Sequence, residues 1–135
     1  MKKIVISGLG AGVVLLLLSI LGLYITIWLF PSVAQQYFDP SFNLQADRAM
    51  LYYLHPFIIS FALSWFWVRV KGVLKGAFIT RGIEFGLIYV LVAVFPMMWL
   101  IYSALNVSLS IVITWFLLAF VQGIVAGLVF EKMNP

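Results

Sequence analysis

Apolar residues fill four long stretches of the chain, which run approximately over 4–30, 50–70, 83–104 and 107–130. Each stretch reaches about the 20 residues that a helix needs to cross a bilayer. The apolar positions follow one another without a period of two, so the strands of a membrane barrel are not indicated. In lipid, backbone N–H and C=O groups must pair within the segment itself, which requires helices. The pattern therefore predicts an all-α integral membrane protein, a bundle of four transmembrane helices that forms a single domain over residues 1–135.

Composition narrows the class of protein further. Hydrophobic residues make up 65% of the chain and charged residues 9%, whereas about a quarter of the residues of a soluble domain are charged. There is no cysteine and a single histidine, so one chain offers neither thiolate ligands nor a histidine pair for haem or metal. We therefore expect no cofactor and no metal site. The first apolar stretch exceeds the roughly 7–15 residues of a signal-peptide core, so we interpret it as a retained helix.

The lysines and arginines predict the orientation, because basic residues gather in cytoplasmic loops. Both termini would be cytoplasmic, with an outer loop over 31–49 that holds only Arg48 and a basic cytoplasmic loop over 71–82. Basic residues in these places are typical of anionic lipid contact, not of nucleic-acid binding. We expect a bacterial cytoplasmic membrane, with membrane lipids as partners. The basic residues on the cytoplasmic side would be Lys2, Lys3, Arg69, Lys71, Lys75, Arg81 and Lys132.

Small residues recur on one face of three of the expected helices. Such residues let helix backbones approach closely in lipid, where apolar burial gives no drive for association. We interpret them as a helix-packing seam that joins the bundle to itself, to a second copy in a homo-oligomer, or to a partner membrane subunit. The glycines within 8–12 are not a nucleotide-binding motif, because no strand precedes them and no acidic partner follows. The seam comprises Gly8, Gly12, Ser19, Gly22, Gly82, Gly86, Ala119, Gly123 and Gly127.

Two short patterns recur along the chain. The pattern Tyr-x5-Phe-Pro occurs at 24–31 and at 89–96, and Ser-x3-Ser/Thr-Trp-Phe occurs at 60–66 and at 110–116. The two offsets differ by about the extra length of the first outer loop. A duplicated helical hairpin would explain both patterns, with the two copies parallel and related by an axis along the membrane normal. The alternative is chance recurrence among apolar residues.

Two ionisable residues within the expected spans are candidates for chemistry, because charged groups are costly in lipid. Glu84 is either a proton or cation site, or it pairs locally with Arg81 near the inner headgroups, which we favour. His55 precedes Pro56 near the outer surface. It either bonds a carbonyl that the proline frees, which we favour, or takes a proton-linked role, or ligates a metal or haem together with a second chain.

The prolines in two of the expected helices suggest a further feature. Pro56 and Pro96 would kink their helices at a similar outer depth. Two kinks at one level can open a cavity toward the outside, bordered by Tyr89, Trp99 and the 31–49 loop. Such a cavity would take an apolar ligand or a lipid. The alternative is that neighbouring side chains fill both bends.

No grouping of a nucleophile, a histidine and an acid is present in the expected spans, so we do not expect an enzyme. The favoured function is a non-enzymatic packing or interaction module, or a subunit of a membrane complex. The alternative is a small oligomeric transporter or channel for a solute, a proton or an apolar ligand. That role would use Glu84 or His55 and an outward-facing cavity, with Tyr89, Trp99 and Gln122 as further candidate residues. For Gln122, at lipid depth, an interhelical hydrogen bond is the default expectation.

Overall fold

The computed structural model describes residues 1–39, 42 and 46–135, with side chains from residue 50 onward in the last of these ranges. The described residues form helices and no strand. The prediction of an all-α protein with four helices long and apolar enough to cross a membrane is confirmed. These helices span Lys2–Leu29, Met50–Val70, Phe78–Ala104 and Leu109–Met133.

A short helix follows the first long helix. Helix α1 (Lys2–Leu29) ends because Phe30 leaves the helical conformation, with φ −130° and ψ 60°. Pro31 then opens α2 (Pro31–Gln36), since proline suits the first turn of a helix, where its missing N–H is not needed. Helix α3 (Ala46–Val70) contains Pro56 in its interior.

The third long helix contains a π turn in its middle. The N–H of Phe95 donates to the carbonyl of Val90, one residue further back than in an α-helix. This wider turn directly precedes Pro96, which has no N–H to donate. The sequence predicts an irregularity at Pro96, and the structure shows it as this π turn. The three parts of the helix are α4 (Phe78–Tyr89), η1 (Val90–Val94) and α5 (Phe95–Ala104).

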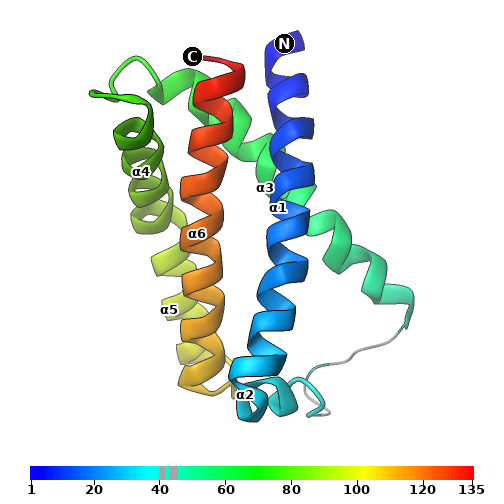
Figure 1. Cartoon of the computed structure of the whole chain (residues 1–135). Coiled ribbons are helices and arrows are strands. Elements are labelled where there is room, and N and C mark those ends of the chain that lie inside the picture. The colour runs from blue at the N-terminus through cyan, green and yellow to red at the C-terminus, as the bar shows by residue number, and fades with distance from the viewer. Residues whose placement is uncertain (40–41, 43–45) are drawn as a thin grey trace.

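Figure 1 shows both termini at one end of the molecule, together with the connection between α3 and α4, and we call this the terminal end. Helix α2 and the turn between α5 and α6 (Leu109–Met133) lie at the other end, the loop end. Helix α1 packs mainly against α3 and also against α6, and α6 packs mainly against α4. Toward the loop end, the first half of α3 diverges from the other helices (Figure 1). The two expected hairpins are thus the two best-packed helix pairs, and the duplication itself stays a prediction.

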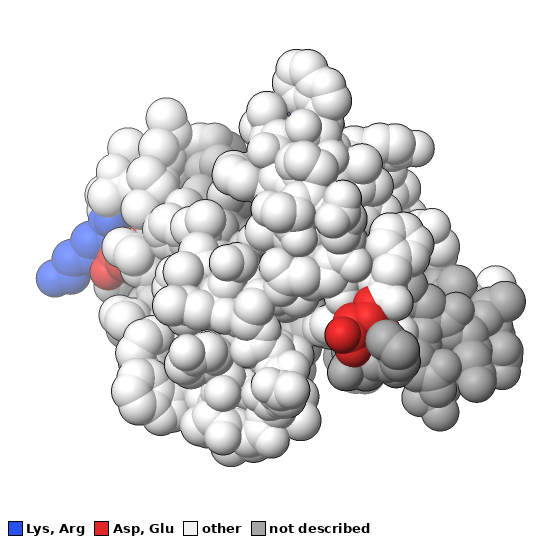
Figure 2. All heavy atoms as spheres, turned by 90° about the horizontal axis from the view of Figure 1, so that it is seen from below, with Lys and Arg blue, Asp and Glu red and all other residues white. Residues whose placement is uncertain are grey.

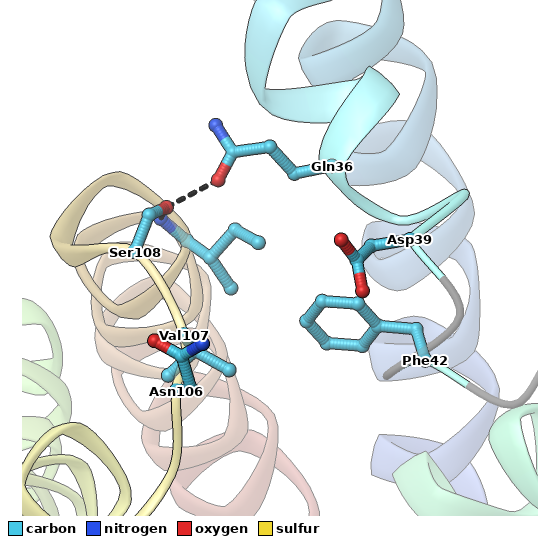
Figure 3. Close-up of a pocket in the computed structure, with 7 residues that line it drawn as sticks. Gln36, Asp39, Phe42, Asn106, Val107 and Ser108 are labelled. Carbon is cyan, nitrogen blue, oxygen red and sulfur yellow. Dashed lines mark hydrogen bonds between the residues drawn. The ribbon is translucent and has the colours of Figure 1, made fainter.

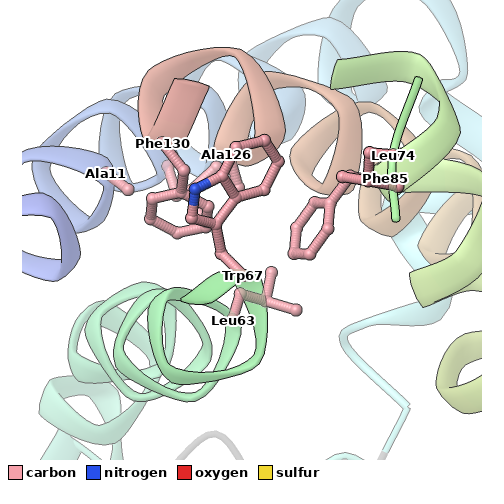
Figure 4. Close-up of a cluster of buried hydrophobic side chains, with 8 residues drawn as sticks. Ala11, Leu63, Trp67, Leu74, Phe85, Ala126 and Phe130 are labelled. Carbon is pink, nitrogen blue, oxygen red and sulfur yellow. The ribbon is translucent and has the colours of Figure 1, made fainter. Parts of the chain in front are cut away.

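The hydrophobic core lies between α1, α3, α4 and α6, and its aromatic part joins the last three of these helices near the terminal end. The fully buried indole of Trp67 contacts the rings of Phe85 and Phe130, at centroid distances of 5.2 and 6.1 Å, and these two rings also contact each other. Figure 4 shows the three rings together, with Leu63 of α3 and Ala126 of α6 beside them. Ring pairs of this kind add about 0.5–1.5 kcal/mol beyond the burial of their area. The terminal end is therefore where these three helices are held together.

The third long helix begins at Phe78 rather than at 83, so the basic connection covers 71–77 instead of 71–82. Gly76 has a positive φ of 99°, which residues with a Cβ rarely adopt, and it turns the chain toward α4. Arg81 thereby lies in the first turn of α4 and not in a surface loop. Hydropathy alone missed this start because the first turn of α4 contains polar residues.

Candidate functional site

Glycines of α4 and α6 bring the backbones of these two helices into direct contact. Gly82 faces Gly127, and Gly86 faces Gly123. A Cβ on Gly127 would lie 2.8 Å from the carbonyl oxygen of Gly82, and one on Gly86 would lie 2.7 Å from the backbone nitrogen of Ile124. These neighbours are backbone atoms that cannot turn aside. A pair of small residues four positions apart on each helix therefore sets the distance between α4 and α6.

The glycines of α1 face side chains instead of backbone. Gly8 and Gly12 lie against the rings of Phe61 and Phe57 on α3. Gly22 lies against a leucine side chain of α6. These seam residues of α1 thus face protein, but their neighbours are side chains that can shift by rotation.

Two hydrogen bonds between buried side chains link α1 to its neighbours. Gln122 Nε2 donates to Ser19 Oγ over 2.9 Å and joins α6 to α1. The hydroxyl oxygens of Ser7 and Ser64 lie 2.8 Å apart and join α1 to α3. Gln122 and Ser19 are therefore engaged with each other in the bundle interior, while Ala119 of the same seam is partly buried on α6.

The other candidate residues for a ligand or proton site lie apart from one another. His55 is exposed in the first half of α3, and Trp99 is 70% exposed on α5. Glu84 lies near the terminal end, where its carboxylate accepts the backbone N–H of Lys75 over 3.3 Å. Tyr89 packs against Gly123 of α6. The structure therefore does not gather these residues into one site.

The two prolines, which the sequence placed at a similar depth, lie in different surroundings, and a cavity between them stays a prediction. Pro56 is buried in α3, whereas Pro96 is exposed on α5. Helix α3 makes its main contacts with α1 and α6, and α5 makes its main contacts with η1 and α6. The prolines have different neighbours because the first half of α3 leans away from the bundle toward the loop end (Figure 1).

The spacing of Arg81 and Glu84 along the sequence predicted that these two residues form an ion pair. In the structure, Arg81 pairs instead with Glu131 of α6. Arg81 Nη1 lies 2.5 Å from Glu131 Oε1, and the two side chains are 19% and 11% exposed. Because the glycines hold α4 and α6 close together, the last turns of α6 bring a second carboxylate to the height of Arg81. Glu131 directly follows the last apolar stretch. The sequence gives no indication of its partner beyond its position next to Lys132.

Further polar groups surround this ion pair and form the terminal cluster (Trp67, Lys71, Arg81, Glu131 and Asn134). The indole N–H of Trp67 donates to the Asn134 carbonyl over 2.9 Å, and Lys71 Nζ donates to Asn134 Oδ1 over 3.2 Å. Arg81 Nη2 donates to the Lys71 carbonyl over 3.0 Å. Among the described residues, three polar side-chain atoms are buried without a hydrogen-bond partner: Arg81 Nε, Glu131 Oε2 and Asn134 Nδ2. Burying such an atom without a partner costs about 1–3 kcal/mol. The cluster ties α3, α4 and α6 together, and its buried atoms offer no surface to a ligand.

A pocket of about 220 Å³ lies at the loop end, between the segment that follows α2 and the start of α6. Figure 3 shows the carboxylate of Asp39 and the ring of Phe42 on one side of it, across from Asn106 and Val107. The hydroxyl of Ser108 donates to the side-chain carbonyl of Gln36. Sequence reasoning named none of these residues, because two turns far apart in the chain carry no shared motif. The pocket is lined by Gln36, Asp39, Phe42, Asn106, Val107, Ser108 and Ile111.

An aromatic cluster (Tyr37, Phe42 and Trp115) holds one wall of this pocket. The ring centroid of Phe42 lies 5.5 Å from that of Tyr37 and 6.2 Å from that of Trp115 on α6. The indole N–H of Trp115 donates to the Tyr37 hydroxyl over 2.7 Å. Burial raises the pKa of Tyr37 above its usual value of 10, so the phenol is neutral at physiological pH. The wall is therefore aromatic and uncharged, with Asp39 beside it.

The described residues contain no group of three or more metal-ligating side chains. The chain matches no protein-family model, no curated protein and no solved structure. Among the pocket's lining residues there is one carboxylate and no histidine, so an acid–base pair is not formed there. The lining of the pocket comprises a carboxylate, two amides, a hydroxyl, a ring and two aliphatic side chains, so it is mixed in polarity.

Proposed function

We propose that the chain is a non-enzymatic integral membrane protein with both termini in the cytoplasm, acting as an interaction module for lipid and for a second copy of itself. The observation that carries this proposal is the separation of charge from apolar surface along the molecule. All seven Lys and Arg residues with described side chains belong to segments at the terminal end. The helices between the two ends are long and apolar.

The distribution of charge supports the orientation. Basic residues at the ends of transmembrane helices are retained on the cytoplasmic side. Viewed from the loop end, the described surface is almost free of charged side chains (Figure 2). The side chain of Arg48, which the sequence assigns to the outer side, lies outside the described residues. The terminal end is therefore proposed to face the cytoplasm of a bacterial cell.

The apolar surface supports insertion into lipid. Large apolar side chains point outward along the helices, among them Leu17, Ile58 and Leu91, each more than 60% exposed. In water, contiguous apolar surface of this extent drives association. In a bilayer, lipid tails cover the same surface, so it is not exposed to water. A bundle with a small core and broad apolar flanks suits a membrane interior.

The loop-end half supports a role in association. Helix α5 has no buried residue, whereas α4 in the same span buries its glycine face against α6. Helices in lipid associate through shape and hydrogen bonds, so a half-helix that contacts α6 but buries none of its residues leaves surface for another helix. Phe95 and Trp99 lie one turn apart on this half. We therefore propose α5 as the contact with a second copy.

Transport through His55 or Glu84 gains no support from their positions. His55 lies in the first half of α3, toward the loop end, and Glu84 lies in the second turn of α4, toward the terminal end. The carboxylate of Glu84 holds the turn before α4 through the Lys75 N–H, which is a structural role. The transporter alternative stays a prediction from the sequence.

Cysteine labelling tests the orientation. The chain has no cysteine of its own, so Ser32→Cys at the loop end and Gly72→Cys at the terminal end give single reporters. A Cβ at position 72 meets no atom within 4 Å, so that substitution is sterically free. In intact cells, an impermeant maleimide should label position 32 and should label position 72 only after the membrane is opened. Labelling of position 72 in intact cells would overturn the orientation, and extraction of the chain by alkaline carbonate would overturn insertion.

A further inference from the structure

Arg69 is stacked on an exposed tryptophan in the last turns of α3, near the terminal end. Its guanidinium carbon lies 3.5 Å from the centroid of the Trp65 ring, and its Nη1 donates to the Trp65 carbonyl over 3.0 Å. Trp65 is 51% exposed, whereas Trp67 is fully buried in the core. The two indoles differ because residues two positions apart lie on nearly opposite faces of a helix. The stacked pair therefore faces away from the core.

Among the described side chains, no acid forms an ion pair with Arg69. The chain has four acidic residues. Glu131 pairs with a guanidinium of α4, and Glu84 accepts a backbone N–H of the connection before α4. Asp39 follows α2 at the loop end, and Asp47 lies in the first turn of α3. At 1.5 Å per residue, that turn is about 30 Å from Arg69. The guanidinium therefore has N–H donors left for an anion from outside the chain.

An arginine held in this way is suited to a phosphate group. A guanidinium presents its N–H donors in a planar fork that matches two oxygens of one phosphate. The ring and the carbonyl of Trp65 hold the fork of Arg69 in one position. Less side-chain freedom is then lost when an anion binds, which strengthens binding.

We propose that Arg69, stacked on Trp65, binds the phosphate of an anionic phospholipid whose acyl chains lie along α3. This inference rests on the proposed function in one respect, namely that the terminal end lies at the level of the lipid headgroups. Exposed tryptophans gather at that level in membrane proteins. Ile58 and Phe61 are exposed earlier on α3, at the spacings of seven and four residues that place them on the face of Trp65. These two apolar side chains suit the acyl chains.

Charge selects an anionic lipid over a zwitterionic one. Seven Lys and Arg side chains, but only two acids, Glu84 and Glu131, are described at the terminal end. A zwitterionic headgroup would bring its own positive charge into this surrounding, beside Arg69. An anionic headgroup brings negative charge alone, which basic residues at the membrane surface attract. The same basic residues also attract anionic lipid diffusely, and diffuse attraction gives no special role to one arginine.

Native mass spectrometry of the full chain, purified in mild detergent, tests this inference. The probes are dioleoyl phosphatidylglycerol, which is anionic, and dioleoyl phosphatidylcholine, which is zwitterionic. We expect phosphatidylglycerol to bind about tenfold more tightly, because the choline charge offsets the contact between the phosphate and Arg69. Equal affinity for the two lipids would overturn the proposal. Displacement of phosphatidylglycerol by equimolar inorganic phosphate would assign Arg69 to a soluble anion and would overturn its assignment to lipid.

Variants at position 69 separate a site from diffuse attraction. Arg69→Gln should lower the affinity for phosphatidylglycerol about tenfold. Arg69→Lys keeps the charge but loses the planar fork, so we expect a loss of about fivefold. Lys132→Gln removes one exposed positive charge from the same end and is the matched control, with the affinity unchanged. Full affinity in Arg69→Lys, or equal losses in Arg69→Gln and Lys132→Gln, would mean diffuse attraction and would contradict the site.

Trp65→Leu tests the same site through the ring. It should lower the affinity for phosphatidylglycerol about threefold, because the guanidinium loses the cation–π contact that holds it. An unchanged affinity would contradict the role of the stacked pair. If Arg69→Gln does not fold, Arg69→Lys and Trp65→Leu still test the site. Detergent micelles have no two leaflets, so a reversed orientation in the cysteine experiment would leave this result intact, and a missing lipid preference would leave insertion and orientation intact.

Discussion

Helices α4 and α5 belong to one apolar span, yet they are packed in opposite ways. Helix α4 meets α6 so closely that a methyl group does not fit at Gly86, whereas α5 contains no glycine and buries no residue. The π turn over Val90–Val94 separates the two. Apolar residues alone do not decide which surfaces pack in lipid, because lipid tails are equally apolar. The difference teaches that small residues, and not hydropathy, select the half of a span that joins the bundle.

The same contrast holds for the two ends of the molecule. The terminal end has an ion pair, a buried indole and hydrogen bonds between three helices. The loop end has the aromatic cluster, a small pocket and a diverging first half of α3. The interactions between helices are therefore concentrated at the terminal end, and the loop end is the part that we propose for association with a second copy. Substitutions at the two ends should differ accordingly.

The largest expected effect is that of Glu131→Ala. The substitution leaves the guanidinium of Arg81, which is 19% exposed, without its carboxylate. Breaking a buried ion pair costs about 3–5 kcal/mol, and we expect about 3 kcal/mol because Arg81 keeps some contact with solvent. Steric trapping in bicelles measures the free energy of unfolding.

Glu84→Ala is the control for this prediction, because Glu84 is the other acid with a described side chain near the terminal end. It loses one hydrogen bond to the Lys75 N–H, worth about 1 kcal/mol. The double substitution Arg81→Met with Glu131→Leu should recover most of the stability, since it removes both charges. Equal losses in Glu131→Ala and Glu84→Ala would mean that the terminal cluster does not hold the helices together.

A methyl group added at Gly86 should have the next largest effect. Alanine is the better helix former by about 1 kcal/mol, so propensity alone predicts a gain in stability. The new Cβ would lie 2.7 Å from the Ile124 backbone nitrogen, and overpacking of this kind costs about 1–3 kcal/mol. We therefore expect Gly86→Ala to destabilise the chain. Ala104→Leu on the exposed end of α5 should change stability by less than about 0.5 kcal/mol, and a gain in Gly86→Ala would refute the close contact.

The sequence was sufficient to predict the four long apolar helices, because hydropathy is a local pattern. It was insufficient for the partner of Arg81, since a choice between Glu84 and the distant Glu131 depends on the relative heights of α4 and α6. The pocket around Asp39 could not be predicted from the sequence either, because its two turns meet only in the folded chain. For Pro96, the sequence indicated an irregularity but not that a π turn would precede it.

Gln122→Leu tests a smaller contribution within the bundle. The substitution removes the donor to Ser19 Oγ and replaces it with an apolar group of similar size. Interhelical hydrogen bonds of this kind contribute about 0.6 kcal/mol on average, so we expect a loss of that size. A double-mutant cycle with Ser19→Ala isolates the pair, and additive losses would show that the two side chains do not interact.

Trp99→Ala should have the smallest effect on the stability of the single chain. The indole is 70% exposed, and its ring contact within the chain is with Phe95, at a centroid distance of 6.3 Å. At high lipid-to-protein ratio, where copies are apart, we expect a change within about 0.5 kcal/mol. A loss above about 1 kcal/mol under that condition would mean that α5 is packed within the chain, contrary to the comparison with α4.

The same variant has its main effect on association if α5 is the contact between copies. Energy transfer between labelled chains, measured as the lipid-to-protein ratio falls, reports the fraction of dimers. Leu17→Ala is the matched control, because Leu17 is 62% exposed on α1 and lies outside the proposed contact. Trp99→Ala should then lower the dimer fraction while Leu17→Ala leaves it unchanged, since shape complementarity at the contact holds helices together in lipid. Equal energy transfer in both variants and in the unmodified chain would exclude α5 as the contact surface, and its exposed side chains would then face lipid alone.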